Sequence, residues 1–264
     1  MPKFAANLSL LFNELPFLDR FEGAAAAGFD AVEFLFPYEY DVDELAARLK
    51  ANGLRQVLFN FPAGNWTAGE RGIAIYPNLA SEFRDSVARA LKYAKALGCT
   101  QLHCLAGIAP AGADHRAMRK TYVENLRFAA RALADDGITL LIEAINTRDV
   151  PGYFLNTTAK AKDILESVEA ENLRLQYDVY HMQIMEGDLA PTIDKYLKKI
   201  AHVQIADTPG RNEPGTGEIN FAFIFDHLDR VGYQGWIGCE YRPRTSTYDS
   251  LGWFRELKPR AERN

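Results

Sequence analysis

The chain has 264 residues, of which 48% are hydrophobic, and this length suits either one barrel or two smaller domains. Its formal net charge is −5 and it contains no run of lysines or arginines, which disfavours a nucleic-acid partner. No stretch approaches the roughly 20 uninterrupted apolar residues of a membrane span, and the first residues lack the apolar core of a secretory signal. We therefore expect a cytoplasmic protein with no membrane partner.

Short apolar runs alternate with helical patterns from one end of the chain to the other. The runs are rich in β-branched and aromatic residues, as buried parallel strands are. They predict eight strands, at residues 4–8, 31–36, 55–61, 101–107, 139–145, 173–179, 200–206 and 236–241. Helical patterns lie between them, for example at residues 44–53, 81–98 and 125–137, and the last of eight covers 250–258. Several close on a glycine that suits a helix C-cap: Gly28, Gly53, Gly98, Gly137 and Gly232.

This alternation indicates a single (β/α)8 TIM barrel, because eight strand–helix units in about 250 residues match the size of that fold. No linker-like segment divides the chain, so we expect one domain over residues 1–264. An open doubly wound sheet would need a phosphate-binding glycine loop after the first strand, and residues 5–9 contain none. Two long connections, residues 62–79 and 207–220, follow strands and are candidates to cover a small substrate.

Four acidic or amide side chains lie at the ends of the last four predicted strands: Glu143, Asp178, Gln204 and Glu240. In a closed barrel the carboxyl ends of the strands meet at one mouth, where active sites lie. Ligands that are all oxygen atoms favour a hard divalent cation, Mg²⁺ or Mn²⁺, over Zn²⁺. The sequence therefore predicts a metal-dependent enzyme.

Basic side chains near the predicted mouth are candidates for binding an anionic substrate. His181 follows Asp178 by three positions, and Arg211 lies in the long connection at residues 207–220. We expect these two to bind a substrate carboxylate. Three other arginines are alternatives: Arg71, Arg148 and Arg242.

The remaining histidines and the cysteines favour structural roles. His202 precedes Gln204 by two positions, so it points into the barrel at a lower level, where we expect it to be hydrogen-bonded. His103 lies within its strand and faces either the core or the cavity, while His115 and His227 fall in helical patterns typical of a surface. The cysteines form no CxxC pair and are expected to be buried, reduced thiols: Cys99, Cys104 and Cys239.

The segments that carry these residues also resemble a known family. LIEAIN, QYDVYHMQ, HVQIAD, EPGTGEIN and GWIGCEY are similar to the hydroxypyruvate isomerases, a branch of the xylose-isomerase-like barrels that includes sugar epimerases. The similarity extends from FAANLSLLF through AVEFLFPY and PAGNWTAGERGIA to GCEYRP, so it covers nearly the whole chain.

The resemblance implies roles for the strand-end residues. Glutamates on the fifth and eighth strands, here Glu143 and Glu240, act as the proton-transferring pair in that family. Related enzymes bind a divalent metal through the residues that match Glu143, Asp178, Gln204 and Glu240. Many sugar epimerases of the superfamily have a histidine where this chain has Gln204.

The same resemblance implies an isomerase that interconverts hydroxypyruvate and 2-hydroxy-3-oxopropanoate (tartronate semialdehyde) by metal-assisted proton transfer through an enediolate. A 2-oxotetronate isomerase or a ketose 3-epimerase could use the same site. A DNA-repair endonuclease with this barrel would need a cluster of metal-binding histidines, and a non-catalytic sugar-binding barrel would not need two glutamates on opposite sides of a metal. The expected partner is a small 2-oxo or hydroxy acid, and a homo-oligomer stays open.

Overall fold

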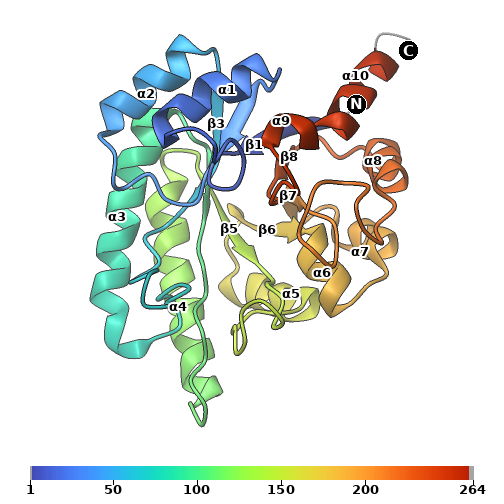
Figure 1. Ribbon diagram of the computed structural model, residues 1–264. Coiled ribbons are helices and arrows are strands. Elements are labelled where there is room, and N and C mark those ends of the chain that lie inside the picture. The colour runs from blue at the N-terminus through green and yellow to red at the C-terminus, as the bar shows by residue number, and fades with distance from the viewer. Residues whose placement is uncertain (1, 262–264) are drawn as a thin grey trace.

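The computed structural model describes residues 2–261 and contains a closed barrel of eight parallel strands. Each strand pairs with its neighbours in the sequence, and the last strand closes the ring by pairing with the first. The strands are β1 (Lys3–Asn7), β2 (Ala31–Glu33), β3 (Arg55–Asn60), β4 (Gln101–His103), β5 (Thr139–Glu143), β6 (Leu173–Asp178), β7 (Ile200–Ile205) and β8 (Trp236–Cys239). This architecture confirms the predicted (β/α)8 barrel (Figure 1).

Helices follow the strands and surround the barrel. Within the described residues the α-helices are α1 (Arg20–Ala26), α2 (Val42–Ala51), α3 (Ala80–Leu97), α4 (His115–Ala134), α5 (Thr158–Val168), α6 (Val179–Met185), α7 (Leu189–Tyr196), α8 (Phe221–Arg230), α9 (Thr247–Ser250) and α10 (Gly252–Ala261), and the 3-10 helices are η1 (Phe17–Asp19) and η2 (Pro77–Leu79). Figure 1 shows α3 and α4 side by side on one flank. The prediction of one helix per strand is wrong, because β6 and β8 are each followed by two helices. Gly187, with a φ of 63°, allows the chain to turn between α6 and α7.

Four strands are at least two residues shorter than their apolar runs predicted. β2 ends at Glu33, β4 at His103, β5 at Glu143 and β8 at Cys239, whereas the runs continue for two to four residues more. The residues that follow these strands remain buried, as Phe34 and Tyr241 show, but they belong to loops rather than to the sheet. The apolar pattern reports burial at the barrel mouth as well as strand pairing.

The inside of the barrel changes from apolar to polar along its axis. A small apolar cluster that includes Ala5, Ala31 and Leu141 fills one level. Because side chains alternate along a strand, the next inward positions on β1 and β2 are Asn7 and Glu33. We call Asn7, Glu33, His202 and Gln204 the inner polar layer; all four are buried. A much larger apolar core surrounds the barrel on its helical side.

The ends of the described chain lie close together, where α10 packs beside β1 (Figure 1). The Phe4 ring contacts the rings of Trp253 and Phe254 at centroid distances of 5.2 and 5.8 Å. The three cysteines are buried and free of disulfides, as predicted. No helix within residues 2–261 combines the length and the apolarity needed to cross a bilayer.

Candidate active site

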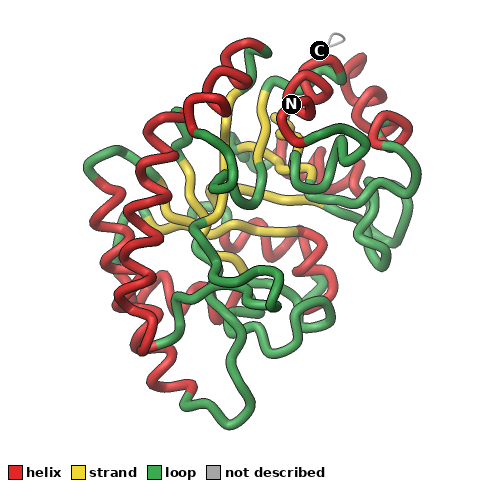
Figure 2. Tube along the Cα trace, turned by 60° about the vertical axis from the view of Figure 1, so that its left-hand side comes forward, coloured by secondary structure: helices red, strands yellow, loops and turns green. Residues whose placement is uncertain are grey.

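A cavity of about 540 Å³ opens at the carboxyl ends of the strands. Glu143, His181 and Glu240 line it, together with residues of the two long connections. Trp66 and Arg71 come from residues 62–79, and residues 209–211 come from the connection after β7. Figure 2 shows the loops, in green, gathered beside the yellow strands of the barrel. Both long connections therefore contribute to the wall of the cavity, as the sequence predicted.

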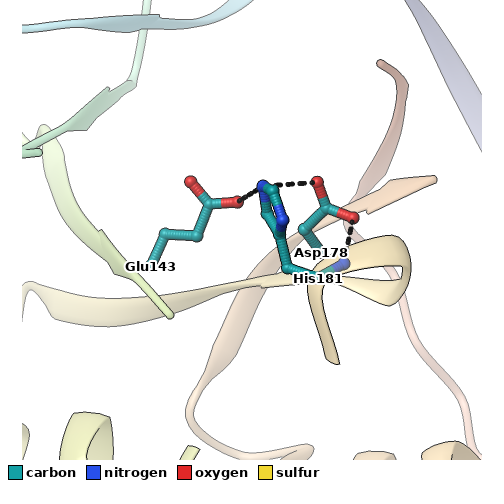
Figure 3. Close-up of side chains that lie close together, drawn as sticks. All are labelled: Glu143, Asp178 and His181. Atoms are coloured by element: carbon teal, nitrogen blue, oxygen red, sulfur yellow. Dashed lines mark hydrogen bonds and ion pairs between the residues drawn. The ribbon is translucent and has the colours of Figure 1, made fainter. Parts of the chain in front are cut away.

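Glu143, Asp178 and His181 lie together at the ends of β5 and β6 (Figure 3). Asp178 Oδ1 accepts the backbone N–H groups of Tyr180 and His181 at 2.8 and 3.4 Å, so this carboxylate caps the N-terminus of α6. His181 Nε2 consequently lies 3.6 Å from Asp178 Oδ2 and 3.9 Å from Glu143 Oε1. Each of the three residues offers one potential metal-ligand atom, and these atoms lie within 4.8 Å of one another, a spacing that could hold a metal ion.

Hydrogen bonds around His181 fix which ring nitrogen carries its proton. Asn146 Oδ1 accepts the backbone N–H of Asp149 at 2.7 Å, which turns the amide Nδ2 toward His181 Nδ1 at 2.6 Å. The Nδ1 atom must then be the acceptor, so Nε2 carries the hydrogen and points toward the two carboxylates. Burial lowers the pKa of His181 well below its ordinary value, which keeps the ring neutral. His181 is thus a hydrogen-bond donor to the cavity.

Glu240 lies directly after β8 and is held there by its backbone, whose N–H donates to the Ile205 carbonyl at 3.1 Å. Its Oε1 accepts a hydrogen bond from Arg211 Nη2 at 2.5 Å. The same nitrogen lies 3.7 Å from Asp178 Oδ2. Arg211 therefore lies in the cavity, as predicted, but its charge faces two carboxylates of the protein.

The connection that carries Arg211 is organised by one buried carboxylate. Asp207 accepts the backbone N–H groups of Gly215, Gly217 and Ile219 at 3.0, 2.8 and 3.1 Å. These bonds fold residues 207–220 back on themselves. Arg211 has a φ of 55°, a left-handed backbone conformation that a non-glycine residue rarely adopts, and the folded loop holds it there.

Gln204 belongs to the inner polar layer just below the cavity. Its Nε2 donates to Glu33 Oε1 at 2.7 Å, and its Oε1 accepts from Gln176 Nε2 at 2.6 Å. Glu33 also accepts from Asn7 Nδ2 at 3.0 Å and pairs with His202 Nε2 at 2.7 Å. His202 is therefore the hydrogen-bonded interior histidine that the sequence predicted.

Comparison with known proteins agrees with this architecture, since residues 21–257 match the sequence profile of the xylose isomerase-like TIM barrels. The chain belongs to that family. A 2-oxo-tetronate isomerase from Cupriavidus necator is 54% identical, with 97% of this chain and 98% of the relative covered. A hydroxypyruvate isomerase from Escherichia coli is 51% identical, with 96% and 98% covered. A solved structure named AP endonuclease, family 2, from Brucella melitensis is 51% identical with a TM-score of 0.95, over 97% of this chain and 99% of that one.

The acidic side chains of this xylose isomerase-like barrel are electrostatically crowded. We call Glu143, Asp178 and Glu240 the acidic mouth. Burial raises the pKa of Glu143 well above its usual range, and the charges of Asp178 and Glu240 raise it further. Burial also raises the pKa of Asp178, against the opposing effect of Arg211, and raises the pKa of Glu240 to about 8. A single arginine cannot neutralise three buried carboxylates, so the mouth favours protons or a further cation.

The donor atoms of the mouth fit a hard divalent cation. Asp178 Oδ2 is buried and has no hydrogen-bond partner among the described residues. Carboxylate oxygens are the ligands that Mg²⁺ and Mn²⁺ prefer. The amide oxygen of Gln204 has one bond, from Gln176, and a carbonyl oxygen can accept a second. The fit of this xylose isomerase-like site to a cation therefore rests on unsatisfied oxygen atoms.

Sequence reasoning missed Glu33 and assigned no role to Gln176, and it left His103 open. His103 lines the cavity, with Nδ1 3.1 Å from Asn60 Oδ1 and Nε2 3.7 Å from Glu143 Oε2. Burial, with the charge of His202, lowers its pKa to about 3, so the ring is neutral. Glu33 ends its strand just as Glu143 does, and that shared position is the signal that could have revealed it. The overlong prediction for β2 hid this signal.

Proposed function

We propose that this protein is an isomerase of small 2-oxo acids that interconverts hydroxypyruvate and 2-hydroxy-3-oxopropanoate. One observation carries the proposal: Glu143 and Glu240 come from different strands, line one cavity, and are both buried with raised pKa values. Moving a carbonyl group by one carbon requires a proton to leave one carbon and another to reach its neighbour. Two carboxyl groups in one cavity can perform these two transfers.

The proposed reaction starts with removal of a proton from C3 of hydroxypyruvate by one glutamate. The resulting enediolate receives a proton at C2 from the other glutamate, while the hydroxyl proton at O3 is transferred to O2. The roles of Glu143 and Glu240 exchange in the reverse direction. His181 supports this chemistry by donating its Nε2–H to a substrate oxygen, since Asn146 holds the ring in that tautomer.

We assign the cation site to Glu143, Asp178, Gln204 and Glu240, with Mg²⁺ or Mn²⁺ as the ion. A bound divalent ion supplies positive charge that stabilises the enediolate. Each glutamate has two carboxylate oxygens, so one can remain available for proton transfer. Asp178 Oδ2, which is buried and has no hydrogen-bond partner within residues 2–261, supports this assignment more directly than any other atom of the mouth.

A four-carbon substrate is the second candidate. The Cupriavidus necator relative, at 54% identity, is named a 2-oxo-tetronate isomerase, whereas the Escherichia coli relative at 51% is named a hydroxypyruvate isomerase. The two acids differ in length but share the reacting 2-oxo group beside a hydroxylated carbon. A cavity of about 540 Å³ accommodates either one.

The name of the Brucella melitensis structure raises an endonuclease as an alternative. The metal-compatible group found within residues 2–261 contains one histidine, His181, with two carboxylates. The chain also has a net charge of −5, which does not favour binding to a phosphate backbone. These features support the isomerase over the endonuclease.

A substrate panel tests the proposal directly. The purified protein would be assayed with hydroxypyruvate, 2-oxotetronate, a ketose and an abasic DNA duplex, before and after chelation. We expect turnover of at least one of the two acids, its loss after chelation, and its recovery with Mg²⁺ or Mn²⁺. Cleavage of the duplex without turnover of either acid would contradict the proposal.

A further inference from the structure

Binding of a 2-oxo acid, which is the substrate class of the proposed function, requires a cation that the protein's own carboxylates leave free. Three arginines line the cavity: Arg71, Arg211 and Arg242. The guanidinium of Arg211 is already paired, because Nη2 bonds Glu240 Oε1 at 2.5 Å and lies 3.7 Å from Asp178 Oδ2. A substrate carboxylate would have to compete with two buried protein carboxylates for it.

Arg71 differs from Arg211 in its partners. Its Nη1 donates to the backbone carbonyls of Trp66 and Glu70 at 3.1 and 2.8 Å, which uses both hydrogens of that nitrogen. No carboxylate of residues 2–261 lies within ion-pair distance of Arg71. The neighbouring Glu70 carboxylate instead accepts the backbone N–H of Asn65 at 2.5 Å. The charge of Arg71 is thus available to a ligand.

The unused atoms of Arg71 form one edge of the guanidinium. Within the described chain, its Nε and Nη2 have no hydrogen-bond acceptor. These two N–H groups are parallel and match the spacing of the two oxygens of a carboxylate, so they can bind it in a bidentate manner. On the opposite side of the guanidinium, the two Nη1 hydrogens bond the carbonyls of Trp66 and Glu70, and these bonds orient the free edge.

The surrounding loop holds the guanidinium in place. The Arg71 guanidinium carbon lies 3.9 Å from the centre of the Trp66 ring, and that ring packs edge-on against Phe36 at 5.0 Å. The backbone N–H of Gly72 donates to the Ala63 carbonyl at 3.0 Å. Because the arginine is braced by an aromatic face and by two carbonyls, it loses little further entropy when a ligand binds. Arg242 is exposed, and no aromatic ring or backbone carbonyl of the described residues supports its side chain.

We propose that Arg71 binds the carboxylate of the substrate through Nε and Nη2, and that it gives the site its preference for acids over uncharged ketoses. This inference rests on the proposed function for the identity of the substrate. It assigns the carboxylate end to the loop after β3 and leaves the reacting carbons beside the acidic mouth on β5, β6 and β8.

The test compares Arg71→Gln, Arg71→Lys and the matched control Arg131→Gln, an exposed arginine on α4 outside the cavity, each as Mg²⁺-loaded protein. We expect Arg71→Gln to raise KM for hydroxypyruvate by about 10- to 100-fold while kcat changes by less than about threefold. The KM of Arg71→Lys should lie between those of Arg71→Gln and the unmodified protein, because lysine keeps the charge but cannot form the bidentate pair. Arg131→Gln should leave KM within about twofold, because it lies outside the cavity.

Binding of unreactive ligands separates this inference from the proposed function. Calorimetry would measure the binding affinity of D-glycerate, which has a carboxylate but no 2-oxo group, and of its uncharged amide, glyceramide. Arg71→Gln should weaken the affinity for glycerate by the same factor by which it raises KM, and it should leave the affinity for glyceramide unchanged. Equal glycerate affinity in the unmodified protein and Arg71→Gln, or equal losses of glycerate affinity in Arg71→Gln and Arg131→Gln, would overturn the inference. If the unmodified protein isomerises no acid yet binds glycerate through Arg71, the proposed function fails and the carboxylate site stands.

Discussion

The inner polar layer and the acidic mouth are neighbouring levels of the same barrel, and their buried carboxylates differ in how many hydrogen-bond partners they have. Glu33 in the inner polar layer is 1% exposed, and both of its oxygens have close partners in Asn7, Gln204 and His202. Glu143 and Glu240 in the acidic mouth are 5% and 9% exposed, so their burial is similar. Glu240 shares Arg211 with Asp178, whose Oδ2 has no hydrogen-bond partner in the described chain. The two oxygens of Glu143 lie 3.7 and 3.9 Å from His103 and His181.

We propose that hydrogen-bond partners, rather than burial alone, distinguish the structural carboxylate of Glu33 from carboxylates that transfer protons. A carboxylate whose oxygens are all hydrogen-bonded is held rigidly in place by its partners. One that is buried beside like charges can exchange a proton or bind a cation. Changes to Glu33 should therefore act on stability, and changes to Glu143 or Glu240 should act on chemistry.

The largest expected effect comes from removing one of the proposed proton-transferring groups of the acidic mouth. Glu143→Gln and Glu240→Gln keep the side-chain size and one potential ligand oxygen, but an amide cannot take up a proton at neutral pH. Isomerisation should fall by at least the roughly 10²–10⁴-fold typical of such a loss. Steady-state rates on hydroxypyruvate would measure it, with the exposed Glu82→Gln on α3 as the control. Retained activity in either variant would remove that residue from the pair.

A smaller effect is expected from disturbing the inner polar layer. A Cβ at Gly238 on β8 would overlap the Glu33 carboxylate. Gly238→Ala should therefore displace Glu33 and lower the free energy of unfolding by roughly 1–3 kcal/mol, as overpacked cores do. Gly252→Ala is the matched control, because nothing lies within 4 Å of the added atom. Denaturant unfolding would measure both, and equal stability of the two variants would contradict the account of the layer.

The smallest expected effect is a pH dependence of stability in metal-free protein. Burial raises the pKa of Glu240 to about 8, and in the unfolded chain this carboxyl returns to an ordinary pKa of about 4.3. Between pH 7 and 8 the folded state therefore binds a proton that the unfolded state has lost. Stability must fall as pH rises through this window, by at most about 1.4 kcal/mol per pH unit for one proton.

Thermal melts at pH 7 and 8 would detect this slope. His103 and His181, whose pKa values burial lowers, oppose this slope only weakly, because a histidine with an ordinary pKa of about 6.5 is about one-quarter protonated at pH 7 in the unfolded chain and nearly neutral at pH 8. Saturating Mg²⁺ should reduce the slope, since ligand carboxylates are deprotonated when metal binds. Glu240→Gln should show a smaller slope than unmodified metal-free protein. A melting temperature of the metal-free protein that does not fall between the two pH values would refute the electrostatic account of the mouth.

The fold was largely predictable because each strand–helix unit carries its own local pattern. The position of Glu143 and Glu240 at predicted strand ends also indicated that they line one cavity, since parallel strands in a ring share a common carboxyl end. The extra helices after β6 and β8 were missed, because short helices such as α6 and α9 have weak periodicity.

Side-chain partnerships across the barrel could not be predicted. Glu33 and His202 are 169 positions apart in the chain, and no local pattern links them. The predicted surface position of His227 was wrong for the same reason, since this residue is buried on α8 and pairs with Asp194 at 2.8 Å. The pairing of Arg211 with Glu240 and the free edge of Arg71 likewise depend on how two long loops fold.

Exchange of solvent deuterium into hydroxypyruvate at C3, followed by NMR, tests most directly whether Glu143 and Glu240 divide the proton transfers between them. Glu143→Gln and Glu240→Gln would be compared with metal shown to be bound to both. One variant should lose both exchange and product, because it lacks the group that deprotonates C3. The other should continue to exchange deuterium without forming product. Near-normal isomerisation in both metal-loaded variants would contradict the account.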